Sequence, residues 1–92
     1  MATTVIDLRK RLAFILHLGF VEIRGLALEG ANHERIATLA DAMEILPKYF
    51  DGVDDEGMEM IRFILTDYKN KFPDSEFDYL RYLERDQPPP WY

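Results

Sequence analysis

The chain has 92 residues, enough for one domain, although a domain of this size buries only about two-thirds of the surface that its unfolded chain exposes. It has no cysteine, which excludes a disulfide framework and a thiolate zinc site and favours a reducing compartment. The formal net charge of −6 at pH 7 argues against DNA or RNA polymers as partners, because affinity for them depends on clustered Lys and Arg.

Residues 5–28 form the longest and most apolar run of the chain, and they are predicted to be one helix. Apolar residues recur there at helical spacing, at Val5, Leu8, Leu12, Ile15, Leu16, Phe20, Ile23 and Ala27. Because more than half of its circumference is apolar, we expect this helix to lie inside the fold. Residues 12–28 are too short and too often interrupted by polar side chains to span a membrane. No secretory cleavage pattern follows Arg9-Lys10-Arg11, so a cytoplasmic protein is expected.

A second helix is predicted between Gly30 and Pro47. Gly30 is expected to end the first helix and Asn32 to cap the second. One apolar stripe follows at offsets of three and four, formed by Ile36, Leu39, Ala40, Met43 and Leu46. Pro47 disfavours α geometry before it and can start a new turn, so a kink or one short helical turn is expected there, burying Tyr49 or Phe50.

A third and a short fourth helix are predicted in the second half of the chain. The third covers residues 55–71, with Asp54 as its N-cap and Phe72-Pro73 as its end. Ser75 opens a pattern that resembles a capping box and is expected to cap a fourth helix ending near residue 85.

These elements predict an all-α fold, a small antiparallel helical bundle of three main helices plus a short C-terminal helix. Residues 1–86 are expected to form a single helical domain. Residues 87–92 contain three consecutive prolines followed by Trp91 and Tyr92, which predicts an extended aromatic tail. The two rings are expected either to fold back on the bundle or to pack on a neighbouring subunit.

Little in the chain favours catalysis or a metal. A catalytic triad needs a serine or cysteine nucleophile. The chain has no cysteine, and its single serine, Ser75, is better explained as a helix cap. His17 and His33 lack the spacing of a metal pair. The acidic residues of 51–59 do not follow the ligand order of a calcium loop. We therefore expect no enzyme, no metal site and no cofactor.

The first helix carries the strongest candidate for a binding site. Its cations repeat every seven residues, with apolar residues between them, so that six side chains share one face: Lys10, Phe14, His17, Val21, Arg24 and Leu28. Such a face offers positive charge for an anion and a ring for stacking. The alternatives are that Arg24 pairs with an acid of the second helix, such as Glu34, and that His17 is a hydrogen-bonded core residue.

Charge is unevenly distributed along the chain. Residues 1–28 carry four basic and two acidic side chains, a net charge of +2, while residues 29–92 carry seven basic and fifteen acidic ones, a net charge of −8. This asymmetry suits head-to-tail association, docking on a charged partner, or a local pocket for an anion. With a small core as well, the chain is expected to form a homo-oligomer whose contacts include the first helix and, through the tail, Trp91.

A resemblance extends this prediction. Ile23-Arg24-x-Leu26, followed by the segment from His33 to Pro47, resembles a pattern of small helical proteins of tailed phages and their hosts. In size and layout these are similar to the anti-CBASS sponges, which sequester cyclic oligonucleotide signals as oligomers. The resemblance implies that Arg24 and Arg35 contact phosphate.

Two functions are therefore expected for a non-enzymatic binding protein. The first is an anti-defence sponge of phage type that sequesters a cyclic nucleotide or a related small anionic signal. The alternative is an acidic inhibitor or immunity protein that binds a basic protein partner through the carboxylates of residues 51–59 and the C-terminal helix.

Overall fold

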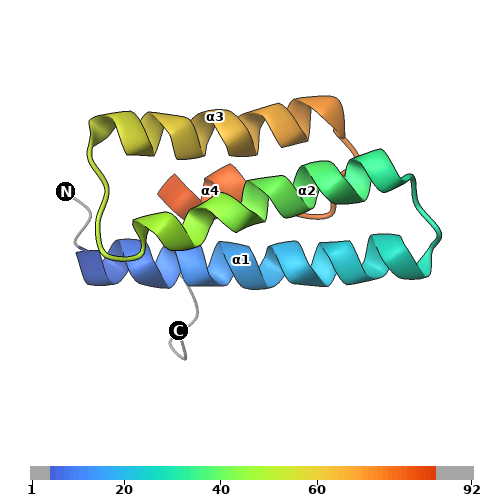
Figure 1. Ribbon diagram of the computed structural model, residues 1–92, viewed down its shortest axis with the longest axis horizontal. Coiled ribbons are helices and arrows are strands. Elements are labelled where there is room, and N and C mark those ends of the chain that lie inside the picture. The colour runs from blue at the N-terminus through green and yellow to red at the C-terminus, as the bar shows by residue number, and fades with distance from the viewer. Residues whose placement is uncertain (1–4, 85–92) are drawn as a thin grey trace.

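A computed structural model of the protein describes residues 5–84, and this part of the chain is all α-helical without a strand. Its elements are α1 (Val5–Leu28), α2 (His33–Ile45), the 3₁₀ turn η1 (Leu46–Tyr49), α3 (Asp55–Lys71) and α4 (Tyr79–Glu84). Figure 1 shows α1, α2 and α3 side by side, with the chain direction reversing at each connection. The predicted bundle of three main helices and a short fourth is confirmed; the aromatic tail lies outside the described residues.

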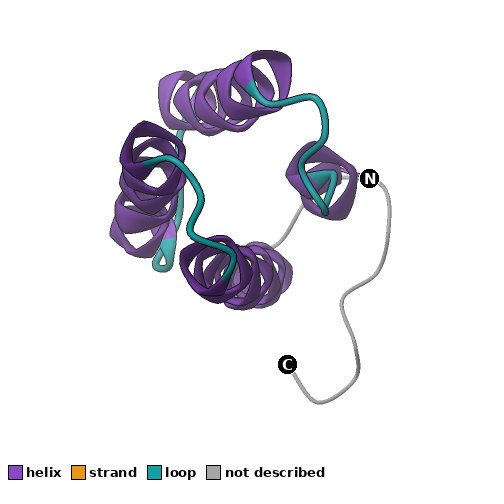
Figure 2. Ribbon diagram, turned by 90° about the vertical axis from the view of Figure 1, so that its right-hand side faces the viewer, coloured by secondary structure: helices purple, strands orange, loops and turns teal. Residues whose placement is uncertain are grey.

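All four helices enclose one apolar core, and Figure 2 shows how the helices are arranged around it. The fully buried side chains of greatest volume come from α1, α2, η1 and α3: Leu12, Ile15, Leu39, Met43, Leu46, Ile61, Leu65 and Tyr68. The short helix α4 adds Tyr79 and Leu83. Apolar residues at helical spacing on each element thus meet in the middle, as amphipathic helices must to bury their apolar faces.

Helix α1 is less deeply buried than its composition suggests. Its buried stripe runs through Leu8, Leu12, Ile15, Leu18 and Leu26. On the other side, Phe20 is 58% exposed and Leu28 is 82% exposed. The expectation that the whole helix lies inside is wrong, because the bundle covers only one side of α1 and nothing in residues 5–84 covers the outer side.

The ends of the helices follow the predicted local chemistry. Gly30 takes a φ of 71°, and the amides of Gly30 and Ala31 donate to the carbonyls of Ala27 and Leu26, which closes α1 with a Schellman motif. The Asn32 side chain accepts from the Glu34 amide at 2.7 Å. These contacts confirm Gly30 as the end of α1 and Asn32 as the cap of α2.

The later boundaries are confirmed except one. Pro47 lies in the 3₁₀ turn, and Asp54 caps α3 by accepting from the Gly57 amide at 2.7 Å. Ser75, in contrast, is not the cap of the fourth helix, which begins only at Tyr79. Its hydroxyl is buried and donates to Glu22 of α1, a partner 53 residues away that a local capping pattern cannot reveal.

Helices α1 and α2 approach closely at Gly19. A Cβ atom built on this glycine would lie 2.0 Å from Sδ and 2.5 Å from Cγ of Met43, whose side chain is 1% exposed. Only a residue without a side chain lets Met43 pack against the backbone of α1.

Candidate functional site

A buried polar cluster is centred on Glu22 of α1. The carboxylate is 3% exposed and accepts hydrogen bonds from three hydroxyl groups. Ser75 Oγ and Tyr79 OH each donate to Oε1 at 2.7 Å, and Tyr68 OH donates to Oε2. The guanidinium of Arg35 lies 3.8 Å from Oε2. Since a buried carboxylate is costly without such partners, the cluster ties α1 to α2, α3, α4 and the segment between α3 and α4.

Tyr68 and Tyr79 both have a raised pKa in this cluster. Burial, and then the hydrogen bond to Glu22, raises the pKa of Tyr68 to about 12. The same two causes, in the same order, raise the pKa of Tyr79. Both hydroxyl groups therefore stay protonated and keep donating at any ordinary pH, which makes the cluster a fixed structural clamp.

Arg35, expected to contact phosphate, is engaged in this cluster. It forms an ion pair with Asp74 at 3.0 Å and lies over the ring of Phe72, 5.3 Å from its centroid. On one side of it is a hollow of about 150 Å³, lined by Glu22, Gly25, Leu26, Glu29, Arg35, Asp74 and Glu76. Four carboxylates against one guanidinium make this hollow unsuited to an anion.

Arg35 also lines a second, larger hollow. This hollow has a volume of about 530 Å³ and is lined by Ala31, Asn32, Glu34, Arg35, Lys71 and Phe72. Two cations and one aromatic ring face this space, although Lys71 also pairs with Asp67 at 3.1 Å. Its volume lies in the range of roughly 300 to 1,000 Å³ that is usual for small-molecule sites.

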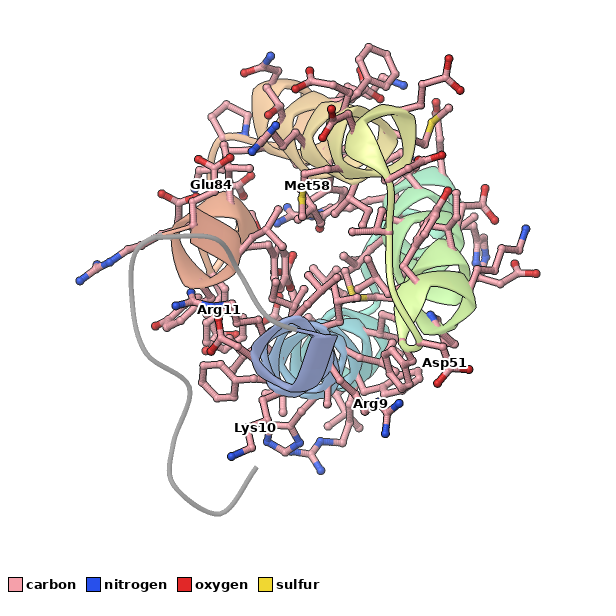
Figure 3. All side chains as sticks on the ribbon, turned by 90° about the vertical axis from the view of Figure 1, so that its left-hand side faces the viewer. Arg9, Lys10, Arg11, Asp51, Met58 and Glu84 are labelled. Carbon is pink, nitrogen blue, oxygen red and sulfur yellow. The ribbon has the colours of Figure 1, made fainter. Side chains whose placement is uncertain are left out.

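The structure divides the predicted face of α1. Lys10, His17 and Arg24 are all exposed, and Figure 3 shows Lys10 pointing away from the bundle. Phe14 instead turns toward α4, where its ring meets that of Tyr82 edge to face at 5.0 Å between centroids. With Arg35 on α2, the five predicted ligand-binding residues are not gathered at one place.

The structure also tests the two alternative interpretations, that His17 is a core residue and that Arg24 pairs with Glu34. His17 is exposed, so the interpretation as a core residue is wrong. Arg24 forms no ion pair within residues 5–84, whether with Glu34 or another acid, and the same holds for Lys10. These two charges stand on an open, convex helix surface.

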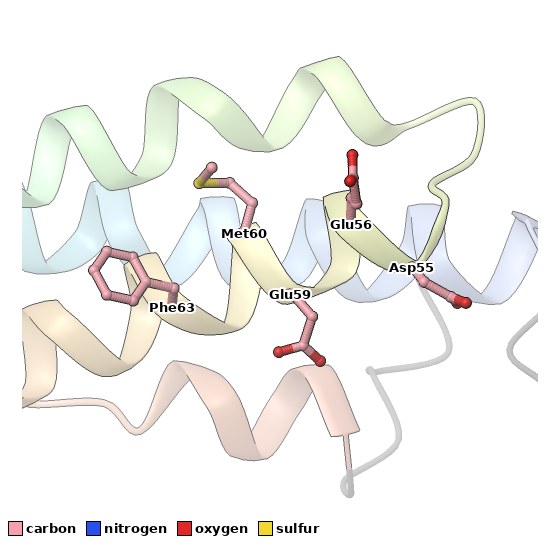
Figure 4. A pocket seen from close by; sticks show the side chains of 5 residues that line it. All are labelled: Asp55, Glu56, Glu59, Met60 and Phe63. Atoms are coloured by element: carbon pink, nitrogen blue, oxygen red, sulfur yellow. The ribbon is translucent and has the colours of Figure 1, made fainter.

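A second exposed surface, the α3 face, consists of Asp55, Glu56, Glu59, Met60 and Phe63. Phe63 is 67% exposed and Met60 is 47% exposed. Together with the three acids they line an open hollow of about 670 Å³, and Figure 4 shows the five side chains on successive turns of α3. Large apolar side chains among charged ones are typical of protein-interaction surfaces.

Some acids of residues 51–59 are already paired, and others are not. Asp51 pairs with Arg9 at 2.8 Å, the contact that Figure 3 shows between α1 and the loop before α3. Glu59 pairs with Arg62 at 2.6 Å. Asp55 and Glu56 form no ion pair with any described residue, so their charge remains available to a partner.

Several of these residues were missed from the sequence. Glu22 lies on the buried stripe of α1, between Leu18 and Leu26, and a carboxylate at that register was a sign of a buried polar cluster. Arg11 is one of three consecutive basic residues in the sequence, but in the structure it is 7% exposed and donates to the carbonyls of Tyr82 and Leu83 at the end of α4.

Comparison with protein families, curated proteins and solved structures gives no match for this chain. Across residues 5–84, no helix has the length and apolar character needed to cross a bilayer. In the same range, no three His, Asp or Glu side chains are grouped so that they could hold a metal ion.

Proposed function

We propose that the protein acts without catalysis, as a binding protein whose α3 face covers a basic surface of a protein partner. The observation that carries this proposal is the exposure of Met60 and Phe63 beside Asp55 and Glu56, two acids that no described residue neutralises. This corresponds to the inhibitor or immunity protein expected from the acidic sequence.

The two kinds of side chain have different roles in such a contact. Aromatic and Met side chains at the centre of an interface supply most of the affinity when water is excluded from them. Acids at the rim raise the association rate and select a basic surface. The α3 face therefore favours a partner with an apolar patch surrounded by Lys or Arg.

Affinity capture followed by titration tests this proposal. Partners retained by the wild-type chain are compared with those retained by a Met60→Ala/Phe63→Ala variant, and a partner lost from the variant is purified. Calorimetry should then show an affinity about tenfold or more weaker for the variant, the usual effect of removing interface anchors. An Asp55→Lys/Glu56→Lys variant should bind the partner more weakly than wild type does. This loss of affinity should be larger at low salt than at high salt, because salt screens the charges.

The control is Asp41→Lys/Glu44→Lys, which makes the same change in net charge on the exposed side of α2. It should leave binding unchanged. Partners that bind the wild type and the Met60→Ala/Phe63→Ala variant equally well would refute the proposal.

A second candidate is sequestration of a small anionic signal such as a cyclic nucleotide. It is favoured by the 530 Å³ hollow, because Arg35, Lys71 and Phe72 line it and outnumber the single acid there, Glu34, and because phosphates pair with cations and bases stack on rings. The exposed Arg24 offers the other phosphate contact. A convex helix alone encloses no ligand, so a site at Arg24 needs a second molecule over it.

Calorimetric titration with a panel of cyclic di- and trinucleotides tests this candidate. Replacing the cation that contacts phosphate should weaken binding by roughly 1.5 to 3 kcal/mol, the scale for a hydrogen bond to a charged group. Lys71→Ala and Arg24→Ala variants distinguish the hollow from the outer side of α1. Heat from no nucleotide, or affinity unchanged in both variants, would refute it.

A further inference from the structure

The outer side of α1 forms a second interaction surface, here called the α1 face, consisting of Lys10, His17, Phe20, Arg24 and Leu28. All five residues are exposed, and Phe20 and Leu28 present apolar groups beside the cations. The spacing of 20, 24 and 28 by one turn each places these three residues in a line along the helix. The α1 face therefore combines exposed apolar side chains with charged ones, as the α3 face does, but its charge is of the opposite sign.

The two surfaces cannot meet within one molecule. Figures 1 and 3, which view the bundle from the side and from its end, both place α1 and α3 on opposite sides. They can meet between two molecules. The exposed cations Lys10 and Arg24 on one face and the exposed acids Asp55 and Glu56 on the other make such a contact locally attractive, whereas two α1 faces or two α3 faces would repel.

The order of residues along the two helices also matches. On α1, Phe20 comes one turn before Arg24; on α3, Glu56 comes one turn before Met60. If the two helices lie antiparallel with Phe20 against Met60, Arg24 comes beside Glu56. The same register places Leu28 opposite Gly52, in the loop just before α3, and His17 opposite Phe63. Phe20 and Met60 then cover each other, while Arg24 and Glu56 gain partners that the described chain does not give them.

We infer that the α1 face of one copy docks antiparallel on the α3 face of the next copy. This rests on the proposed function, since it names the basic surface that the α3 face binds as the chain's own α1 face. The contact joins two different surfaces on opposite sides of the bundle, so it generates a ring or an open row and not a two-fold dimer.

Charge exchange between two variants tests the contact. The first variant, Arg24→Glu/Leu28→Glu, makes the α1 face acidic. The second, Asp55→Lys/Glu56→Lys, makes the α3 face basic. Each variant by itself has the same sign of charge on its α1 face and its α3 face. In a mixture, the α1 face of one variant can bind the oppositely charged α3 face of the other. All four positions are exposed, and circular dichroism checks that both variants fold.

Sedimentation velocity from micromolar to millimolar concentration measures the outcome. Wild type should associate beyond a dimer as concentration rises, each variant alone should associate at least about tenfold more weakly, and the equimolar mixture should regain association. Asp41→Lys/Glu44→Lys, with the same change in net charge as the second variant, should associate at least as well as wild type.

A wild-type chain that stays monomeric throughout, a stable two-fold dimer, or a mixture no more associated than its components would each overturn the inference. The proposed function fails separately. A monomeric chain that still loses a captured partner on Met60→Ala/Phe63→Ala would remove self-docking and leave the proposed function in place. If the wild-type chain does not associate and the Met60→Ala/Phe63→Ala variant captures the same partners as wild type, both self-docking and the proposed function are refuted.

Discussion

Replacing Glu22 with Gln tests whether the buried cluster holds the four helices together. Gln has nearly the same shape, so the core is not emptied, but it carries no charge. Its carbonyl oxygen can still accept from Ser75 and Tyr79, while its amide nitrogen faces the Tyr68 hydroxyl, which must then rotate to accept. Arg35 keeps only Asp74 as an anionic partner.

The magnitude follows from the three hydroxyl donors. A hydrogen bond to a charged group contributes about 1.5 to 3 kcal/mol and a neutral one about 0.5 to 1.5 kcal/mol, so roughly 1 kcal/mol is lost at each hydroxyl and roughly 3 kcal/mol in total. A typical domain is stable by only about 5 to 15 kcal/mol. For a domain of this length the midpoint of thermal unfolding should fall by roughly 10 to 20 °C.

Urea unfolding followed by circular dichroism measures this loss. Glu29→Gln removes the same charge at an exposed position and should change the free energy of unfolding by less than about 0.5 kcal/mol. Tyr79→Phe should cost less in the Glu22→Gln protein than in wild type, because its hydroxyl then loses only a neutral acceptor. A Glu22→Gln protein as stable as wild type would refute the reasoning, since three donors to a buried charge would then contribute nothing.

Four further predictions concern stability. Because the pKa of Tyr68 is raised to about 12, the folded chain keeps a proton that the unfolded chain loses near pH 10. Tyr68 alone should thus lower the free energy of unfolding by up to roughly 3 kcal/mol between about pH 10 and pH 12, and a fall as steep in Tyr68→Phe as in wild type would contradict this. A Cβ atom added at Gly25 would meet no neighbouring atom within 4 Å, so Gly25→Ala should stabilise the helix by about 0.5 to 1 kcal/mol in thermal unfolding. Gly19→Ala should destabilise it by roughly 1 to 3 kcal/mol through contact with Met43, and equal effects at the two glycines would count against the close packing. Arg11→Met should leave the carbonyls of Tyr82 and Leu83 without this donor and lower the free energy of unfolding by roughly 2 kcal/mol. Hydrogen exchange should be faster in α4 of this variant than in wild type.

The sequence by itself determined the class of fold and the ends of most helices. Gly30, Asn32, Pro47 and Asp54 act within one turn of their own position, through a positive φ, a side-chain cap or a missing amide, so their effects can be deduced locally. Periodic apolar residues likewise showed that the elements are helices and that they pack together.

The tertiary structure alone decided what the polar residues do. Ser75 appears in the sequence as a cap but binds Glu22, and Arg35 pairs with Asp74, a contact that the sequence did not predict, because both partners are far away along the chain. Apolar composition made α1 seem buried all round, but a bundle with neighbours on one side leaves Phe20 and Arg24 exposed. Which side of a helix faces the core depends on which neighbours cover it, and their positions are set by the packing of the whole chain.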